Sequence, residues 1–237
     1  YPYNHITAVD GDMSAGGGME YPNITVISTA GSKDLLEYVI MHEVGHNWFY
    51  GILGSNERDH TWMDEGINEY SNIRYWQKKY KGRNERIIFS EFVQNKLGIA
   101  KNLSMSWFTY AGYANSGKSK DAQPLNLTAE KYIGGNYWQH YSKTAVFMRY
   151  LEHYLGEDKM DEILQDFYRQ WEFRHPYPED LKAVFATHIQ EDLEWFFDNV
   201  FNKTTYVDYG IIKTGDQFIL DNYGTFTCPV EVAFYNG

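Results

Sequence analysis

The sequence contains a single cysteine, Cys228, and this scarcity excludes both an intrachain disulfide and a metal site built from cysteine thiolates. It also lacks any apolar run near the roughly 20 residues that a membrane-spanning helix needs. Basic residues are few, with 21 Lys and Arg against 32 Asp and Glu. The net charge of −11 therefore disfavours nucleic acid or an anionic membrane as a partner. Hydrophobic residues, in contrast, make up 43% of the 237 residues, enough to bury a substantial core.

The chain begins at Tyr1 without an initiator methionine or a signal peptide. We therefore expect a processed product or part of a longer protein, and the sequence does not assign a compartment. Export to the periplasm or to the cell exterior is one option. Four Asn-x-Ser/Thr sequons would matter only in a glycosylating secretory pathway.

The spacing of apolar residues predicts an α+β fold that is mostly helical. One alternating run near the N-terminus, Asn23 to Thr29, predicts a strand after a glycine-rich loop. Residues 98–128 have weak periodicity and are predicted to be a loop with short helical pieces. The predicted helices span residues 34–50, 61–80, 86–96, 136–155, 158–171, 178–188 and 192–200. The predicted C-terminal strands lie in the runs TYVDYGII, QFILDN and VEVAFY.

The segment MHEVGHNWFYG, from Met41 to Gly51, carries the clearest chemical signal. His42 and His46 are four residues apart, so a helix places both imidazoles on one face, where they can bind one zinc ion. Glu43 follows the first histidine and can act as the base for a metal-bound water. The segment therefore predicts a zinc site with an adjacent general base.

A third protein ligand must come from elsewhere in the chain, with a fourth position open for water. Glu65 lies 18 residues beyond His46, near the start of the next predicted helix. The alternative is that Glu65 is a solvated carboxylate at a helix start. The neighbouring Asp64 is predicted to pair with Thr61 in a capping box.

These residues resemble the M1 family of zinc aminopeptidases, within the gluzincin metallopeptidases. The H-E-x-x-H string, the 18-residue spacing and the flanking HNWFYG and WMDEG carry the resemblance, which covers about residues 1–200. GGMEY at Gly17 to Tyr21 is similar to the family's G-x-M-E-N motif, and Tyr141-Ser-Lys143 is similar to its Tyr-x-Lys-Gly motif. The resemblance implies a thermolysin-like catalytic domain over residues 1–202, with its first strands missing. Residues 203–237 would then begin a C-terminal β-domain.

The resemblance also implies a role for each matching residue. His42, His46 and Glu65 would hold one zinc ion per chain, and Glu43 would be the general base. Tyr141, which would otherwise be read as a core residue, would donate a hydrogen bond to the oxyanion of the intermediate.

The GGMEY motif implies the site for the substrate's free amine. Glu20 would pair with the α-ammonium group. Gly17 and Gly18 would let the backbone run beside an extended peptide, with the strand at Asn23 to Thr29 supplying a pairing edge.

Glu69 is a further candidate, inferred from spacing. It lies four residues after Glu65 and so shares a helix face with it. It could accept the outer N–H of a ligand histidine. The alternative is a glutamate that faces solvent.

The sequence departs from the family pattern at several positions. Tyr21 stands where the family has Asn, Thr144 stands where it has Gly, and the zinc helix ends in WFYG where WFGN is frequent. The family also usually has an N-terminal β-domain that contributes a polar group to the amine site. We therefore expect a partner domain of this kind in the same parent protein.

The sequence thus predicts a zinc metallopeptidase, most simply an aminopeptidase that removes N-terminal residues from peptides by attack of a zinc-bound water. One alternative is an endopeptidase on the same scaffold, in which Glu20 binds side chains instead of the amine. Another is a zinc-retaining binding module without catalysis. Glu43 argues against the module, because a scaffold needs no base beside its metal.

Overall fold

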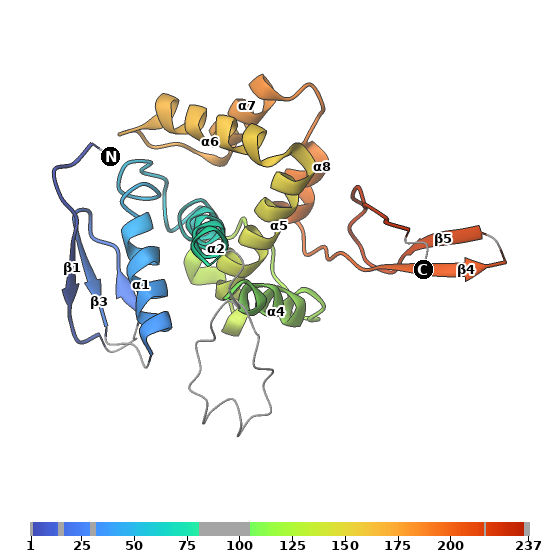
Figure 1. Ribbon diagram of the computed structural model, residues 1–237, viewed down its shortest axis with the longest axis horizontal. Helices are drawn as coiled ribbons and strands as arrows, with labels where there is room; N and C mark the ends of the chain where they lie inside the picture. Colours follow the sequence, from blue (N-terminus) through green and yellow to red (C-terminus); the bar gives the residue numbers. More distant parts are fainter. Residues whose placement is uncertain (1, 14–16, 29–31, 81–104, 216, 235–237) are drawn as a thin grey trace.

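The structure is a computed structural model that describes residues 2–13, 17–28, 32–80, 105–215 and 217–234. Three parts follow one another along the chain (Figure 1): a small sheet beside a helix, a group of packed helices, and a hairpin that extends away from them. None of the helices in the described part of the chain combines the length and apolar character needed to cross a bilayer.

The small sheet has three strands in the order β1-β3-β2. β1 (Thr7–Asp10) runs parallel to β3 (Ile24–Ile27), and β2 (Gly18–Met19) pairs antiparallel to β3, with Gly18 opposite Ile27. Side chains alternate along β3, so Thr25 and Ile27 are buried while Ile24 is exposed. The run predicted as a strand is therefore the central strand, and β1 and β2 are the edge strands.

Helix α1 (Lys33–Gly45) packs against β3 and β2. Its N-terminus is capped by Ser32, whose hydroxyl accepts a hydrogen bond from the backbone N–H of Leu35 at 3.2 Å. The helix ends five residues before the predicted end at Tyr50, whose backbone φ of 98° lies outside the helical range.

The next element is a wide helical turn, η1 (Trp62–Gly66), which leads directly into α2 (Ile67–Lys79). η1 is a single π-helical turn, a local feature that often marks functional sites. α2 packs against α1 on one side and α5 on the other. The two elements together replace the single predicted helix at 61–80.

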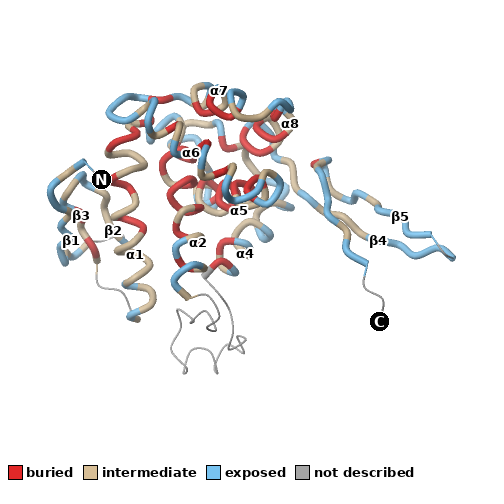
Figure 2. Tube along the Cα trace, turned by 45° about the horizontal axis from the view of Figure 1, so that its top comes forward, coloured by how far each residue is buried: buried red, intermediate tan, exposed pale blue. Residues whose placement is uncertain are grey.

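The remaining helices build the core around α5 (Gln139–Leu155), which packs against α2, α4 (Met105–Gly117) and α6 (Glu157–Trp171). α7 (Pro178–His188) covers α6, and α8 (Glu194–Phe197) continues into the π-turn η4 (Asp198–Asn202). Two short 3₁₀ turns, η2 (Ala129–Lys131) and η3 (Gly134–Trp138), precede α5. Buried residues concentrate on α2, α5 and α8 (Figure 2). The largest fully buried side chains include Trp62, Tyr70, Trp76, Phe167, Phe185, Phe196 and Phe226.

The chain ends in an antiparallel hairpin of β4 (Tyr209–Thr214) and β5 (Gln217–Asn222). The hairpin extends away from the helices (Figure 1), and most of its residues are exposed. Its exposed apolar side chains include Ile211, Ile212, Phe218, Ile219 and Leu220.

Several sequence predictions differ from this fold. α4 occupies part of residues 98–128, which were predicted to be a loop with short helical pieces. No strand forms over residues 230–234 of the third predicted C-terminal run. β1 and β2 were not predicted: β1 has no buried face, and β2 is only two residues long. The predicted helix at 86–96 lies outside the described residues.

Candidate metal centre and active site

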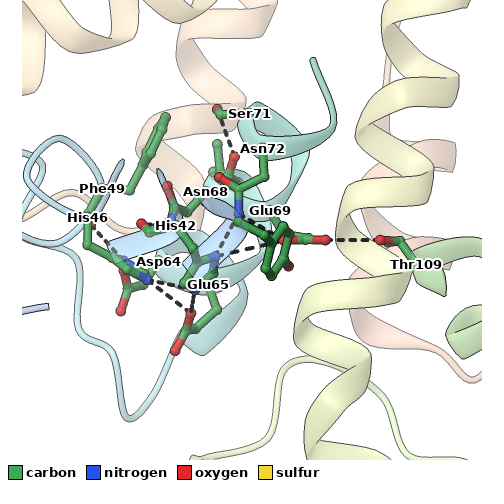
Figure 3. A network of polar contacts seen from close by, with 12 residues as sticks. His42, His46, Phe49, Asp64, Glu65, Asn68, Glu69, Ser71, Asn72 and Thr109 are labelled. Atoms are coloured by element: carbon green, nitrogen blue, oxygen red, sulfur yellow. Dashed lines mark hydrogen bonds and ion pairs between the residues drawn. The ribbon is translucent and has the colours of Figure 1, made fainter. Parts of the chain in front are cut away.

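The two histidines of the H-E-x-x-H segment lie one helical turn apart on α1 and point toward η1. Their Nε2 atoms are 3.1 Å apart, and each lies 3.1 Å from Oε2 of Glu65 (Figure 3). Hydrogen bonds from both histidines hold the pKa of Glu65 well below its usual range, although burial by itself would raise it. Three ligand atoms thus converge on one point from two separate elements.

The geometry of this cluster fits a zinc ion. Tetrahedral zinc with bonds of about 2.0–2.1 Å separates its ligand atoms by roughly 3.3 Å, close to the 3.1 Å separations observed. The outer Nδ1 of His46 donates toward the carboxylate of Asp64, which leaves the lone pair of its inner Nε2 available to a metal. His42, His46 and Glu65 together form a set of potential metal ligands.

Asp64 holds the second histidine of the cluster. Its buried carboxylate lies 2.6 Å from Nδ1 of His46. The prediction that Asp64 caps a helix with Thr61 is wrong, because Thr61 donates its hydroxyl hydrogen bond to the carbonyl of Glu57 and makes no capping bond. The wide turn of η1 lets Asp64 and Glu65, which are consecutive, both reach the histidines.

Asn72 is a residue that the sequence prediction missed. Its Nδ2 atom lies 2.7 Å from Nδ1 of His42 and also donates to Oε2 of Glu69 at 3.0 Å. Glu69 itself is 3.8 Å from Nδ1 of His42, so Asn72 is the nearer partner. The spacing 65, 69 and 72 follows one face of a helix and could have indicated it.

The alternative that Glu69 faces solvent is wrong, since it is only 4% exposed. Its carboxylate accepts hydrogen bonds from the hydroxyl groups of Tyr38 and Thr109 as well as from Asn72. Glu69 therefore connects α1, α2 and α4.

Glu43 lies beside the cluster and is buried. Within the described residues, its Oε2 atom has no hydrogen-bond partner. Burial raises the pKa of this carboxyl group to about 7, which brings it into the range where a group can both take and return a proton at neutral pH.

The edge strand β2 passes directly over Glu43. A Cβ atom on Gly18 would lie 2.4 Å from Cγ of Glu43, so only glycine permits this approach. The prediction that residues 23–29 supply a free pairing edge is wrong, because β3 is the central strand and pairs with β1 and β2. Carboxylate oxygens of Glu20, Asp64 and Glu65 lie within 4.8 Å of one another, which places Glu20 next to the metal ligands. Burial raises the pKa of Glu20.

Tyr141 comes from α5 and completes the site. Its ring stacks on that of His42 with centroids 5.7 Å apart. Burial, together with the nearby charge of Glu65, raises the pKa of its phenol well above the usual value, so the hydroxyl keeps its proton. It can therefore act as a hydrogen-bond donor.

A single cavity of about 380 Å³ brings these groups together. It is lined by every predicted site residue, namely Gly17, Gly18, Glu20, His42, Glu43, His46, Glu65, Glu69 and Tyr141. Tyr38, Val39, Phe108, Thr109, Trp138 and Ser142 form the rest of its lining. The roles assigned to these residues stay predictions.

The helical fold and the His-His-Glu cluster with its adjacent glutamate are of the kind found in zinc metallopeptidases. The chain belongs to peptidase family M1: the family model described as "Peptidase family M1 domain" matches residues 1–200.

Individual relatives are similar at low identity. Mouse aminopeptidase B is 25% identical over 186 residues, which cover 74% of this chain and 26% of the relative. Human aminopeptidase Q is 26% identical over 162 residues, which cover 67% of this chain and 15% of the relative. The chain thus spans about a quarter or less of the length of these relatives.

The fold is shared with solved structures from Deinococcus radiodurans. A mutant M1 zinc metallopeptidase with a bound Tyr-Ser-Ala substrate superimposes with a TM-score of 0.60. The match has 16% identity and covers 85% of this chain and 40% of the other.

Proposed function

We propose that this chain is the catalytic part of a zinc aminopeptidase, which hydrolyses the first peptide bond of a peptide with a free N-terminus. One observation carries the proposal: a metal-ligand set, a buried carboxylate, a tyrosine hydroxyl and a second carboxylate all face one cavity. The aminopeptidase names of the similar proteins support it.

The bound zinc ion would supply a Lewis acid and lower the pKa of a water molecule at the site. Glu43 takes a proton from the attacking water and returns one to the leaving amine. Tyr141 donates a hydrogen bond to the oxyanion that develops on the scissile carbonyl. Each of these groups lies in the cavity wall near the metal ligands.

Glu20 gives the proposed enzyme its exopeptidase character. Its carboxylate pairs with the α-ammonium of the substrate, while the backbone of β2 lies along the extended peptide. The amine then fixes which peptide bond reaches the metal ligands.

The proposal extends to the organisation of the parent protein. The catalytic domain occupies residues 1–202, and residues 203–237 begin a C-terminal β-domain, an assignment supported by the exposed apolar residues of the hairpin β4–β5. An N-terminal β-domain of the same parent would complete the amine site, which accords with the greater length of the relatives.

Glu43→Gln tests whether the site is catalytic. Glutamine keeps the size of the side chain but cannot accept the proton, so zinc should stay bound while turnover falls by roughly 10²-fold or more. Metal content and hydrolysis of aminoacyl amides by the zinc-loaded protein provide the two readouts. A rate equal to that of the wild type would exclude Glu43 as the base, whereas a zinc-loaded wild type without any turnover would favour the binding module.

Glu20→Gln tests the aminopeptidase assignment against the endopeptidase alternative. Losing one charged contact, worth about 1.5–3 kcal/mol, should lower kcat/KM for free-amine peptides by roughly 10- to 100-fold. N-acetylated peptides lack the cation, so their slow cleavage should hardly change. An equal loss of kcat/KM for both kinds of peptide would favour the endopeptidase alternative.

A further inference from the structure

Two carboxylates flank the metal ligands from opposite sides. Glu20 lies near Asp64, which contacts His46, whereas Glu69 lies beside Asn72, which contacts His42. Figure 3 shows His46 and Asp64 on one side of Glu65, and Glu69 and Thr109 on the other. The cavity therefore has an acidic group at each end.

This arrangement gives a direction to a bound peptide. If Glu20 takes the α-ammonium, the scissile carbonyl lies at the metal ligands. The residue after the scissile bond must then extend past His42 toward Glu69. Its side chain meets the part of the cavity formed by Tyr38, Val39, Phe108, Thr109 and Glu69.

Glu69 is an unusual residue to line such a pocket, because its side chain carries a carboxylate and is only 5% exposed. Its three hydrogen-bond donors are all neutral: the Tyr38 hydroxyl, Nδ2 of Asn72 at 3.0 Å and the Thr109 hydroxyl at 2.9 Å. Within the described residues, its only ion-pair partner is Nδ1 of His42 at 3.8 Å, and no lysine or arginine pairs with it. Buried carboxylates are normally paired with a cation or a metal.

The carboxylate also has acceptor capacity left. An ionised carboxylate offers about four acceptor positions, and the structure gives Glu69 three donors. Among the described residues, Thr109 alone donates to Oε1, so this oxygen can accept one more hydrogen bond. A cationic side chain entering from the cavity would supply both the missing donor and the missing charge.

We propose that Glu69 selects the residue on the leaving side of the scissile bond and favours lysine or arginine there. The proposal rests on the proposed aminopeptidase function, since Glu20 sets the direction of the peptide. The apolar rings of Tyr38 and Phe108 would line the aliphatic stem of such a side chain, while its charged end meets Glu69.

The test compares the peptides Ala-Lys-Ala, Ala-Met-Ala and Ala-Glu-Ala, which differ only after the scissile bond. The zinc-loaded wild type should cleave the lysine peptide with the highest kcat/KM and the glutamate peptide with the lowest. In Glu69→Gln, the preference for lysine over methionine should fall by roughly 10- to 100-fold, the scale of one charged contact. Glutamine can keep all three contacts, because the Thr109 hydroxyl can accept as well as donate.

Glu57→Gln is the matched control. Glu57 is an exposed carboxylate whose charge acts on Glu20, so this variant removes the same charge from the other end of the site. It should leave the ratio between lysine and methionine peptides unchanged. A ratio that changes equally in both variants would show a general electrostatic effect and overturn the proposal.

A second outcome would also overturn it. If Glu69→Gln lowers cleavage of all three peptides equally and weakens zinc binding, Glu69 acts through Asn72 and His42 instead. Calorimetric binding of the same peptides to Glu43→Gln, with and without Glu69→Gln, measures selectivity without turnover. If Glu43→Gln binds the lysine peptide most tightly but the wild type cleaves none of the peptides, only the proposed function is contradicted. If the three peptides bind with equal affinity, the proposed selectivity of Glu69 is contradicted.

Discussion

At the scale of single residues, Tyr50 holds a backbone conformation that glycine favours. Its φ is 98°, and it directly follows the turn that ends α1. A bulky residue with positive φ is a rare and costly choice. The family motif often has glycine at this point, and the conformation explains why. Phe173, with φ of 59°, carries the same kind of strain away from the cavity.

Replacing Tyr50 with glycine should therefore stabilise the protein. Left-handed backbone costs an L-residue about 1–2 kcal/mol, and the greater freedom of glycine in the unfolded chain offsets part of that. A net gain of about 1 kcal/mol corresponds to a rise in Tm of roughly 2–4 °C. Thermal unfolding followed by circular dichroism measures it.

Phe173→Gly should give a similar rise, since its side chain is 58% exposed. Tyr110→Gly, in the helix α4, should instead lower Tm because glycine destabilises a helix interior. A fall in Tm for Tyr50→Gly would mean that the contacts of its ring outweigh the strain.

At the scale of elements, a buried lysine joins α5 to the segment after η4. Nζ of Lys143 donates to the carbonyl of Lys203 at 2.9 Å, and the residue is only 5% exposed. Burial lowers the pKa of this amine to about 7. In the unfolded chain the pKa returns to about 10.4.

This difference makes stability depend on pH in a predictable direction. Between about pH 7 and pH 10 the unfolded chain holds the proton more tightly than the folded protein, so the free energy of unfolding rises with pH. Lys143 contributes a slope of up to about 1.4 kcal/mol per pH unit in that window. Urea unfolding of Lys143→Met at pH 7, 8 and 9 should lack this component.

Lys120→Met is the matched control, because Lys120 is exposed. Its stability should follow the wild-type pH dependence. If Lys143→Met keeps the wild-type slope as well, the amine of Lys143 is not the group that releases the proton.

Sequence patterns predicted the elements that have a clear polar face or carry a chemical motif. α7 begins and ends where it was predicted, since Pro178 starts it and the pattern of apolar residues ends at His188. α4 was missed because it has no charged residue to mark a solvent face. β2 was missed because two residues carry no periodicity.

The same limit applies within the site. Residue spacing identified His42, His46 and Glu65 as candidate metal ligands, because the motif lies on consecutive elements. Asp64 contacts His46 only because of the wide turn of η1, which no local pattern reveals. Asn72 lies on the helix face of Glu65 and Glu69, but its contact with His42 depends on the packing of α2 on α1.

At the scale of the whole molecule, the proposed metal ligands would connect α1 to η1. Anything that binds the folded state alone stabilises it, and a zinc concentration 1,000 times the Kd adds about 4.1 kcal/mol. Removing zinc with a chelator should therefore lower Tm by roughly 8–16 °C for a chain of this size. Calorimetry with and without the chelator measures the shift.

His46→Ala should abolish that shift, because it removes one ligand. His5→Ala is the control, since His5 is exposed and lies outside the cavity, and it should keep the full response to the chelator. An undiminished response in His46→Ala would exclude this residue as a ligand.

The order of the site residues along the chain also determines the order in which they are synthesised. The metal ligands and the groups that hold them lie between residues 42 and 72, whereas Tyr141 comes 69 residues later on α5. Ribosomes add about 5–20 residues per second, so Tyr141 is made roughly 3–14 s after Asn72. The ligand set closes over a short loop, which favours early formation during synthesis. A growing chain can thus bind a metal ion before Tyr141, the proposed oxyanion donor, has been made.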